Sequence, residues 1–419
     1  MAIVKNIYLR LYFFIMLLYV FFNKGVAYSF LVEVLFAGGL FLFFFLRREI
    51  EITWNKRTKI LLAFILLSIL YLLIGSLNYP LIQIIRDSFV FQYAWFVYIL
   101  FSFKEEQGYI WDKLFIIYKW FPVIALLNFI LQYFVPFVAS TAIFGSIPIM
   151  LYKNGDMGVH LLISTIFLFL FPDRYSSKWK AGLLFLIVFN FIVVSAYSRS
   201  GMLSYLVGLI CFFVFTKDQI LKSNSKYFLK YLPWIMLVIV PLFLTINVGE
   251  NFQGRSAGFS QLGQNVGSIV GAADDANLEN NEIWRLLWWG KIIDYSFTPE
   301  YFFTGKGLGM SLAQTDEIKA DDDLRSPHNF HLTIMARFGV IVFCIWIYWL
   351  VLLFKPMFKR KLVGKQMAIS CILLAFVINA SFDVFLEGPM GAFPFWTFIG
   401  LLFISEATKE DQSLPPTNN

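Results

Sequence analysis

Apolar stretches of about 20 residues recur along almost the whole chain, and no other feature constrains its fold as strongly. A helix of that length crosses the ~30 Å hydrocarbon core of a bilayer and satisfies its own backbone hydrogen bonds there. Hydrophobic residues make up 59% of the 419 residues, charged residues only 15%, and the mean hydropathy is +0.70. This composition excludes an ordinary soluble domain and predicts an all-α polytopic membrane protein.

Twelve apolar runs predict about 12 transmembrane helices. The predicted spans are Asn6–Phe22, Val26–Leu46, Ile60–Leu77, Ile82–Phe101, Leu114–Val135, Met157–Phe171, Ala181–Tyr197, Gly201–Phe215, Tyr231–Ile246, His328–Phe354, Gln366–Phe382 and Gly391–Ile404. The sixth is short, and prolines and glycines at Pro136, Pro148, Gly155 and Gly158 interrupt its approach, so a re-entrant or partly unwound segment stays open there. Residues 1–246 thus hold spans one to nine, 247–327 a large loop, 328–405 spans ten to twelve and 406–419 a tail.

Lys and Arg residues alternate strongly between the two sides of the predicted spans. One set of loops carries clusters such as Arg47 and Arg48, whereas the short loops of the other set carry only Lys24, Lys153 and Arg199. Because basic residues favour cytoplasmic loops, both termini are predicted to be cytoplasmic and the large loop to face the periplasm. The net charge of +7 follows from this bias and gives no indication of a nucleic-acid partner.

The large loop changes character along its length. Residues Asn247–Asn277 are rich in Gly, Ser, Asn and Gln and are expected to be flexible. An amphipathic helix is predicted next, capped by Asn280 or Asn281. Its apolar positions are Trp284, Leu287, Trp288 and Ile292. Its tryptophans are Trp284, Trp288 and Trp289. Since indole rings prefer the headgroup region, we expect this helix to lie at the membrane interface.

The end of the loop leads into the tenth span. Gly305–Gly309 is expected to form a tight turn, and Asp321–Asp323 a solvated acidic segment. Ser326 is expected to cap the tenth span with Pro327 in its first turn. His328 would then lie beside a helix N-terminus.

Arg199, Arg285 and His328 are the candidate chemical residues on the outward side. The planar guanidinium binds phosphate oxygens in pairs, so two arginines at a membrane boundary suit a lipid-linked diphosphate. Histidine can take a proton from an attacking hydroxyl near neutral pH. Each has a structural alternative: Arg199 as a snorkelling anchor, Arg285 as a cation resting on Trp289, and His328 as a hydrogen-bonding side chain.

Further candidates for contact with substrate or acceptor are Asn329, Lys153 and Glu387, although a solvated carboxylate explains Glu387 equally well. Arg86 and His160 lie at or within spans and are expected to be structural, Arg86 through a pair with Asp87 or a helix neighbour. His328-Asn329-Phe330-His331 lacks the spacing and glutamate of a zinc-protease helix. No metal site is therefore predicted.

Several motifs together resemble the O-antigen ligase and O-antigen polymerase superfamily. They are Ser198-Arg199-Ser200-Gly201, Arg285 with Trp289, Gly307-Leu308-Gly309, and Pro327-His328-Asn329-Phe330 leading to Gly339. The resemblance covers the second half of the chain in order and topology, and the first half only as a set of spans. The late Phe382–Pro389 segment followed by Phe395-Trp396 is more similar to the polymerase branch.

The resemblance implies a metal-independent, inverting glycosyltransferase of the bacterial inner membrane, without a cofactor. Its donor would be an oligosaccharide carried on undecaprenyl diphosphate, with Arg199 and Arg285 on the diphosphate and His328 as the base. Membrane lipid, a chain-length regulator and a flippase of the same pathway are the further partners implied.

Three functions remain open at this point. A polymerase would transfer the glycan to a lipid-linked repeat unit, and a ligase would transfer it to lipid A core. The mildly acidic balance of the large loop favours the polymerase, because a phosphorylated core would favour a basic surface. Twelve spans also suit a transporter or flippase of lipid-linked sugars, but the polar cluster at one face favours a fixed site open to one side.

Overall fold

The computed structural model describes residues 2–144, 147–149, 152–216, 230, 233–235, 237, 276–318 and 325–413. The chain forms two compact units, each assembled from separate parts of the sequence. Unit 1 comprises residues 1–35, 105–275 and 360–379, and unit 2 comprises residues 36–104, 276–359 and 380–419. Most of the predicted ninth span and of the Asn247–Asn277 segment, together with Asp321–Asp323, lies outside the described residues.

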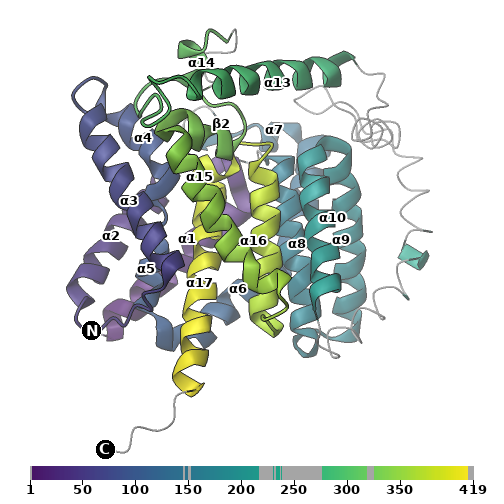
Figure 1. The fold of residues 1–419 in the computed structure, drawn as a ribbon. Helices are drawn as coiled ribbons and strands as arrows, with labels where there is room; N and C mark the ends of the chain where they lie inside the picture. Colours follow the sequence, from purple (N-terminus) through teal and green to yellow (C-terminus); the bar gives the residue numbers. More distant parts are fainter. Residues whose placement is uncertain are drawn as a thin grey trace, which may run out of the picture. The chain divides into compact units, whose positions relative to one another are not determined.

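Unit 1 is a helix bundle. Its elements are α1 (Ala2–Phe22), η1 (Asn23–Val26), α6 (Gln107–Phe134), α7 (Pro136–Ala139), β1 (Ala142–Phe144), β2 (Ile147–Pro148), α8 (Asn154–Leu170), η3 (Pro172–Arg174), α9 (Ser177–Tyr197), α10 (Arg199–Phe215) and α16 (Gly364–Ala380), which ends at the unit boundary. Helix α8 packs against α6, α9 and α10 (Figure 1). The strands β1 and β2 form a short antiparallel pair.

The predicted sixth span is a continuous helix, α8, and not an unwound segment. Its glycines allow a close helix contact, because a Cβ built on Gly158 would lie 2.3 Å from the carbonyl oxygen of Gly201 in α10. The buried carboxylate of Asp156 in the first turn of α8 accepts hydrogen bonds from the side-chain amides of Asn23 and Asn379. Small residues and satisfied polar groups therefore hold this helix in place.

Unit 2 contains the remaining elements. These are most of α2 (Leu31–Leu46), α3 (Lys56–Gly75), α4 (Leu81–Gln92), α5 (Trp95–Phe101), α13 (Ala276–Ser296), α14 (Leu312–Thr315), α15 (Phe330–Phe358), η4 (Phe385–Glu387) and α17 (Pro389–Ser413), with η2 (Lys104–Glu106) at the boundary. Helix α13 runs across the N-terminal end of α15 (Figure 1). Helix α17 packs along α5 and contacts η4.

The predicted fourth span is broken in the structure. Helices α4 and α5 meet at a 53° bend around Tyr93 and Ala94, where no proline or glycine marks the break. The ring of Phe36 packs edge-on against Phe89, Tyr93 and Phe96, which lie on both sides of the bend. Tertiary aromatic packing thus accompanies a bend that the sequence pattern does not show.

Helix α15 is kinked at Gly339, whose φ of 85° lies in the region that favours glycine. The kink frees two carbonyl oxygens, and the predicted tight turn supplies their donors. Lys306 N–H donates to Ala336 O at 2.8 Å, and Gly307 N–H donates to Arg337 O at 2.9 Å. Gly305, Gly307 and Gly309 all have positive φ, so the expected turn is confirmed and its role is to dock on this kink.

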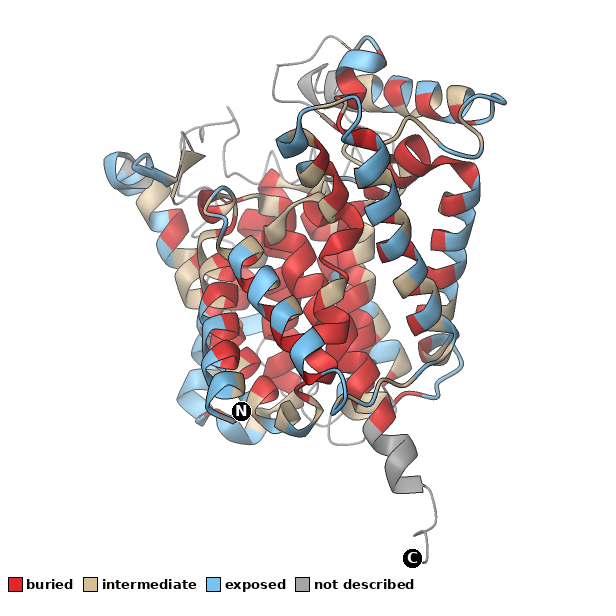
Figure 2. Ribbon diagram, turned by 90° about the vertical axis from the view of Figure 1, so that its left-hand side faces the viewer, coloured by how far each residue is buried: buried red, intermediate tan, exposed pale blue. Residues whose placement is uncertain are grey.

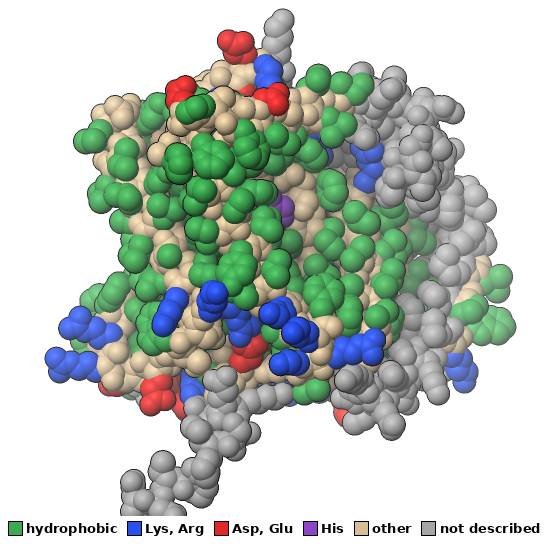
Figure 3. Space-filling view, viewed as in Figure 1, with side chains coloured by type: hydrophobic (Ala, Val, Ile, Leu, Met, Phe, Trp, Pro, Cys, Tyr) green, Lys and Arg blue, Asp and Glu red, His purple; other side chains and the backbone are tan. Residues whose placement is uncertain are grey.

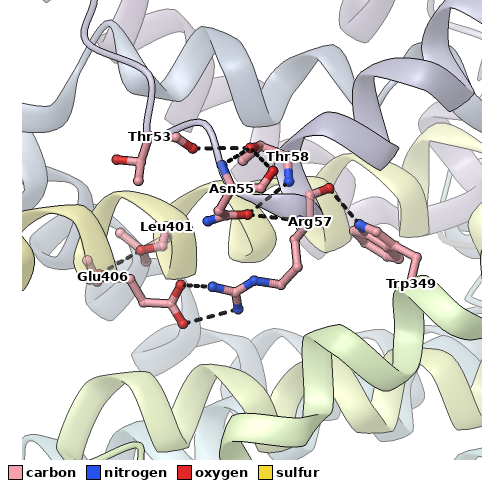
Figure 4. Close-up of polar contacts among 8 residues, drawn as sticks. Thr53, Asn55, Arg57, Thr58, Trp349, Leu401 and Glu406 are labelled. Carbon is pink, nitrogen blue, oxygen red and sulfur yellow. Dashed lines mark hydrogen bonds and ion pairs between the residues drawn. The ribbon is translucent and has the colours of Figure 1, made fainter.

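At the opposite end of α15, a polar clamp joins three helices of unit 2 (Figure 4). Arg57 of α3 binds both carboxylate oxygens of Glu406 in α17. The indole N–H of Trp349 in α15 donates to the carbonyl oxygen of Arg57 at 3.0 Å. Asn55 caps α3 by accepting from the backbone of Arg57 and Thr58. The fork geometry of the Arg57–Glu406 pair fixes the ends of α3 and α17 relative to each other.

Six described helices are long and apolar enough to cross a membrane, and the bent pair α4 and α5 makes a seventh. Four shorter apolar helices, α2, α8, α10 and α16, coincide with further predicted spans. Buried residues follow the helix faces that meet other helices (Figure 2). On the face in Figure 3, Lys and Arg side chains gather below a broad hydrophobic area. The all-helical membrane architecture is confirmed, whereas the count of twelve and the orientation of the termini remain predictions.

We expect Glu406→Ala to destabilise the protein by about 1–3 kcal/mol, because it leaves the half-buried Arg57 without its carboxylate. Thermal unfolding in nanodiscs would measure this loss. The exposed Glu51 provides the control, and Glu51→Ala should change stability by less than about 0.5 kcal/mol. Equal shifts in the two variants would show that the clamp contributes nothing specific.

Candidate functional site

Helix α13 positions the candidate site, and it differs from the predicted helix in two ways. It begins at Ala276, so Asn280 and Asn281 lie inside the helix and neither is its N-cap. Asparagine is less favourable than alanine within a helix, but a helix can include it. Its buried face is formed by Trp288 and Ile292, whereas Leu287 is 65% exposed. The face of α13 that packs against the protein is therefore narrower than the apolar face predicted from the sequence.

The buried stripe of α13 packs on α14 and α15. Trp288 and Ile292 join a core with Leu312, Ala313, Met335, Ala336 and Val340. The indole of Trp288 also donates to Asp316, which pairs with Lys306 of the docked turn. Two of the three tryptophans expected at the membrane interface are thus tied to protein, since Trp289 N–H donates to Pro327 O at 2.8 Å.

His328 lies just before α15 and not within it. Asn329 is the N-cap, so the prediction that Ser326 caps this helix with Pro327 in its first turn is wrong. Asn329 is the cap because its side-chain oxygen accepts hydrogen bonds from two backbone N–H groups, those of His331 at 3.1 Å and Leu332 at 3.2 Å. His328 has a φ of 53°, a conformation that costs free energy for a residue with a Cβ and often occurs at functional sites.

Three separate segments of unit 2 meet around His328. Its Nδ1 lies 3.9 Å from Oδ1 of Asp383, which follows α16. Its ring packs edge-on against Trp284 of α13, with the centroids 5.8 Å apart. The imidazole is therefore held between a carboxylate and an aromatic ring, and its side chain keeps 26% of its surface exposed.

Arg285 contacts the same tryptophan ring as His328 and the residue next to Asp383. Its guanidinium carbon lies 5.5 Å from the centroid of the Trp284 ring, and its Nη1 donates to the carbonyl oxygen of Phe382 at 3.2 Å. The cation thus rests on the ring of Trp284 and not on that of Trp289, which the sequence predicts for the structural alternative. Because Phe382 and Asp383 are adjacent, Arg285 and His328 share both the indole and the segment after α16.

Arg199 and Lys153 belong to unit 1. Arg199 is the first residue of α10, whose N-cap Ser198 accepts from Gly201 N–H at 3.1 Å. Lys153 directly precedes α8, and its backbone N–H donates to Asn23. Arg285, His328, Asn329 and Glu387 all belong to unit 2. A role for Arg199 or Lys153 beside His328 therefore stays a prediction.

Glu387 is not a solvated loop carboxylate. It lies in η4, and Oε1 accepts a hydrogen bond from the Thr333 hydroxyl of α15 at 2.7 Å. Burial raises the pKa of Glu387, while hydrogen bonds from Thr333 and Ser326 and the charge of Arg337 oppose that rise. This contact joins the segment after α16 to the first turn of α15, on which His328 depends.

Asp87 and Asp383 are polar residues of unit 2 whose contacts do not follow from the sequence pattern. Asp87 of α4 pairs with Arg325 and Arg337 and not with Arg86, for which Asp87 or a helix neighbour is the predicted partner. An acidic residue within a predicted span is a signal that could have found Asp87, because such a charge needs a partner. Asp383 belongs to the Phe382–Pro389 segment, but its proximity to His328 depends on the fold.

The cap assignment predicts that Asn329→Ala destabilises the protein by about 1 kcal/mol, since two backbone donors lose their acceptor. Asn329→Asp keeps the acceptor oxygen and should restore stability. Thermal unfolding of both variants, with transfer activity measured beside it, separates a cap from a substrate contact. Normal stability in Asn329→Ala would contradict the cap.

The raised pKa of Glu387 predicts a pH-dependent effect of Glu387→Gln. When the pKa of a carboxyl is higher in the folded than in the unfolded protein, the folded state binds the proton more tightly. The stabilisation that this provides is fully present below the unfolded-state pKa and is lost as pH rises through the folded-state pKa. The midpoint of thermal unfolding of Glu387→Gln, minus that of the wild type, should therefore grow as pH rises from about 4. A difference that is independent of pH would contradict burial as the dominant cause.

Comparison with known proteins bears on the same part of the chain. The family described as O-antigen ligase matches residues 181–347. This range includes Arg199, Arg285, His328 and Asn329, and it ends before Asp383 and Glu387. No curated protein matches the chain. The match and the motif order agree, and residues 181–347, less than half of the chain, are similar to the O-antigen ligase family.

Proposed function

We propose that this protein is an O-antigen polymerase, a glycosyltransferase that extends a surface polysaccharide at the periplasmic face of the inner membrane. It moves a glycan from undecaprenyl diphosphate to a hydroxyl of a lipid-linked repeat unit. The observation that carries the proposal is that Arg285 and His328 both contact the Trp284 ring, while Asp383 faces His328. The family match over residues 181–347 supports a glycan-transfer role.

In this proposal His328 acts as general base on the acceptor hydroxyl. The oxygen attacks the anomeric carbon from the side opposite the diphosphate, a new C–O bond forms, and the old C–O bond breaks with its electron pair moving to the diphosphate. The proton passes to His328, and the configuration at the anomeric carbon inverts. The Asp383 carboxylate, 3.9 Å from Nδ1, then faces the imidazolium and stabilises its charge.

Arg285 is the group proposed to bind the diphosphate. A fixed guanidinium stabilises the negative charge that grows on the leaving oxygen. Phe382 O and the Trp284 ring restrict its side chain, so less freedom is lost when the substrate binds. Arg199 is proposed to assist from unit 1 on the strength of the motif alone. A chain-length regulator and a flippase of the pathway are proposed partners.

The ligase is the second candidate, because it shares the donor and differs only in the acceptor. The sequence of residues 247–327 favours the polymerase, since its acidic residues outnumber its basic ones and an anionic core would favour the reverse. A transporter would instead bind its sugar without cleaving the bond to diphosphate.

The test is conversion of purified undecaprenyl-diphosphate-linked repeat units by the protein in proteoliposomes. The polymerase proposal predicts a ladder of longer lipid-linked chains. His328→Ala should lower the rate about 10²–10⁴-fold, the usual contribution of a general base. Arg285→Ala should also abolish most of the ladder. His331→Gln is the matched control, because His331 accepts a hydrogen bond from Trp346 and has no proposed chemical role.

Transfer only after lipid A core is added would replace the polymerase with the ligase. Uptake of lipid-linked sugar without any transfer would support a transporter. A full ladder from His328→Ala would contradict the proposed base.

Asp383→Asn gives a separate prediction about positioning. It removes the charge that faces the imidazolium, so we expect kcat to fall at least about tenfold with a changed pH profile and a smaller effect on KM. An unchanged pH profile would show that Asp383 has only a structural role.

A further inference from the structure

Asp87 lies at the centre of a positively charged cluster in unit 2. Its carboxylate accepts from Gly309 N–H at 2.9 Å, from Arg337 at 3.0 Å and from Arg325 at 3.3 Å. Arg86, the residue before Asp87 in α4, is close enough to Arg325 for the two charges to repel. Among the described residues, three guanidinium groups thus lie around the Asp87 carboxylate, and the Glu387 carboxyl interacts with one of them, that of Arg337.

Arg325 is incompletely satisfied by this arrangement. Its Nε is buried, and within the described part of the chain no hydrogen-bond acceptor reaches it. Burial lowers the pKa of Arg325, and the charges of Arg86 and Arg337 lower it further against the opposing effect of Asp87. A buried donor beside excess positive charge is a site where an anion would be favourable.

Arg86 gives the cluster an accessible cation in an apolar setting. Its side chain is exposed, and among the described residues it makes no hydrogen bond or ion pair. Leu81 and Ile82, one turn earlier on α4, are 58% and 66% exposed. Exposed apolar side chains beside the Arg86 cation suit a ligand that has a phosphate attached to a lipid chain, because the cation can bind the phosphate and the apolar side chains can contact the lipid.

We propose that Arg86 and Arg325 form a second anion-binding site, which takes the diphosphate of a lipid-linked substrate. The inference rests on the proposed function, because polymerisation joins two substrates that both carry a lipid diphosphate. Arg285 binds the diphosphate of the donor, and Arg86 with Arg325 binds that of the acceptor. Arg325 precedes His328 by three residues, so the same segment connects the second anion site to the base.

The proposal is tested by native mass spectrometry with undecaprenyl diphosphate as the probe. The wild type should bind two lipids, and Arg86→Gln should bind the second at least about tenfold more weakly, the loss expected for a charge-assisted contact. The exposed Arg47 provides the matched control, and Arg47→Gln should bind like the wild type. Equal binding by Arg86→Gln and wild type would overturn the proposal.

Arg325→Lys is the second variant, because it keeps a charge for Asp87 but removes the fork and the buried Nε. It should also weaken the second lipid. A parallel titration with phosphatidylglycerol distinguishes the source of the phosphate. Loss of phosphatidylglycerol binding in Arg86→Gln, with undecaprenyl diphosphate unaffected, would assign the site to ordinary phospholipid and overturn its role with substrate.

Activity separates this inference from the proposed function. His328→Ala should still bind two lipids while making no chain. Arg86→Gln should raise KM for the repeat unit, with the pH profile of kcat unchanged. If the wild type makes no chains but binds two lipid diphosphates, the proposed function fails and the second site stands. If it makes chains and binds only one, the second site fails.

Discussion

One buried carboxylate, Asp87, joins the turn at Gly305–Gly309 and the segment before α15 to the helices of unit 2. A charge within a membrane helix normally has partners, and the described residues give Asp87 three: the backbone of Gly309 and the side chains of Arg325 and Arg337. These partners come from the docked turn, the segment before α15 and α15 itself. The position of His328, three residues after Arg325, therefore depends on an ion pair made by α4.

The kink of α15 completes this arrangement. Without a Cβ at Gly339, the backbone of Phe302 and Phe303 can approach the helix, and the turn that follows supplies donors to the freed carbonyl oxygens. Trp288 and Asp316 then tie α13 to the same turn. As a result, Arg285 on α13 and His328 before α15 reach the same indole, although 42 residues separate them in the sequence.

Hydrophobic periodicity predicts the helices well but not how their ends and breaks are arranged. The turn at Gly305–Gly309 could be predicted because glycine marks positive φ, whereas the bend between α4 and α5 carries no such residue. Ser326 and Asn329 are both good caps by type, and only the path of the chain decides between them. The sequence likewise identifies Arg285 and His328 as candidate chemical residues. Their shared contact with Trp284 and the proximity of Asp383 to His328 depend on the tertiary structure.

We propose that the donor diphosphate binds at Arg285, close to the base His328. The most direct measurement is a cryo-electron microscopy map of the protein in nanodiscs with undecaprenyl diphosphate. The account predicts density for the diphosphate within hydrogen-bond distance, about 3 Å, of the Arg285 guanidinium, with the His328 imidazole facing the same cavity. A map with no diphosphate density beside Arg285, even where the lipid occupies the site at Arg86 and Arg325, would contradict it.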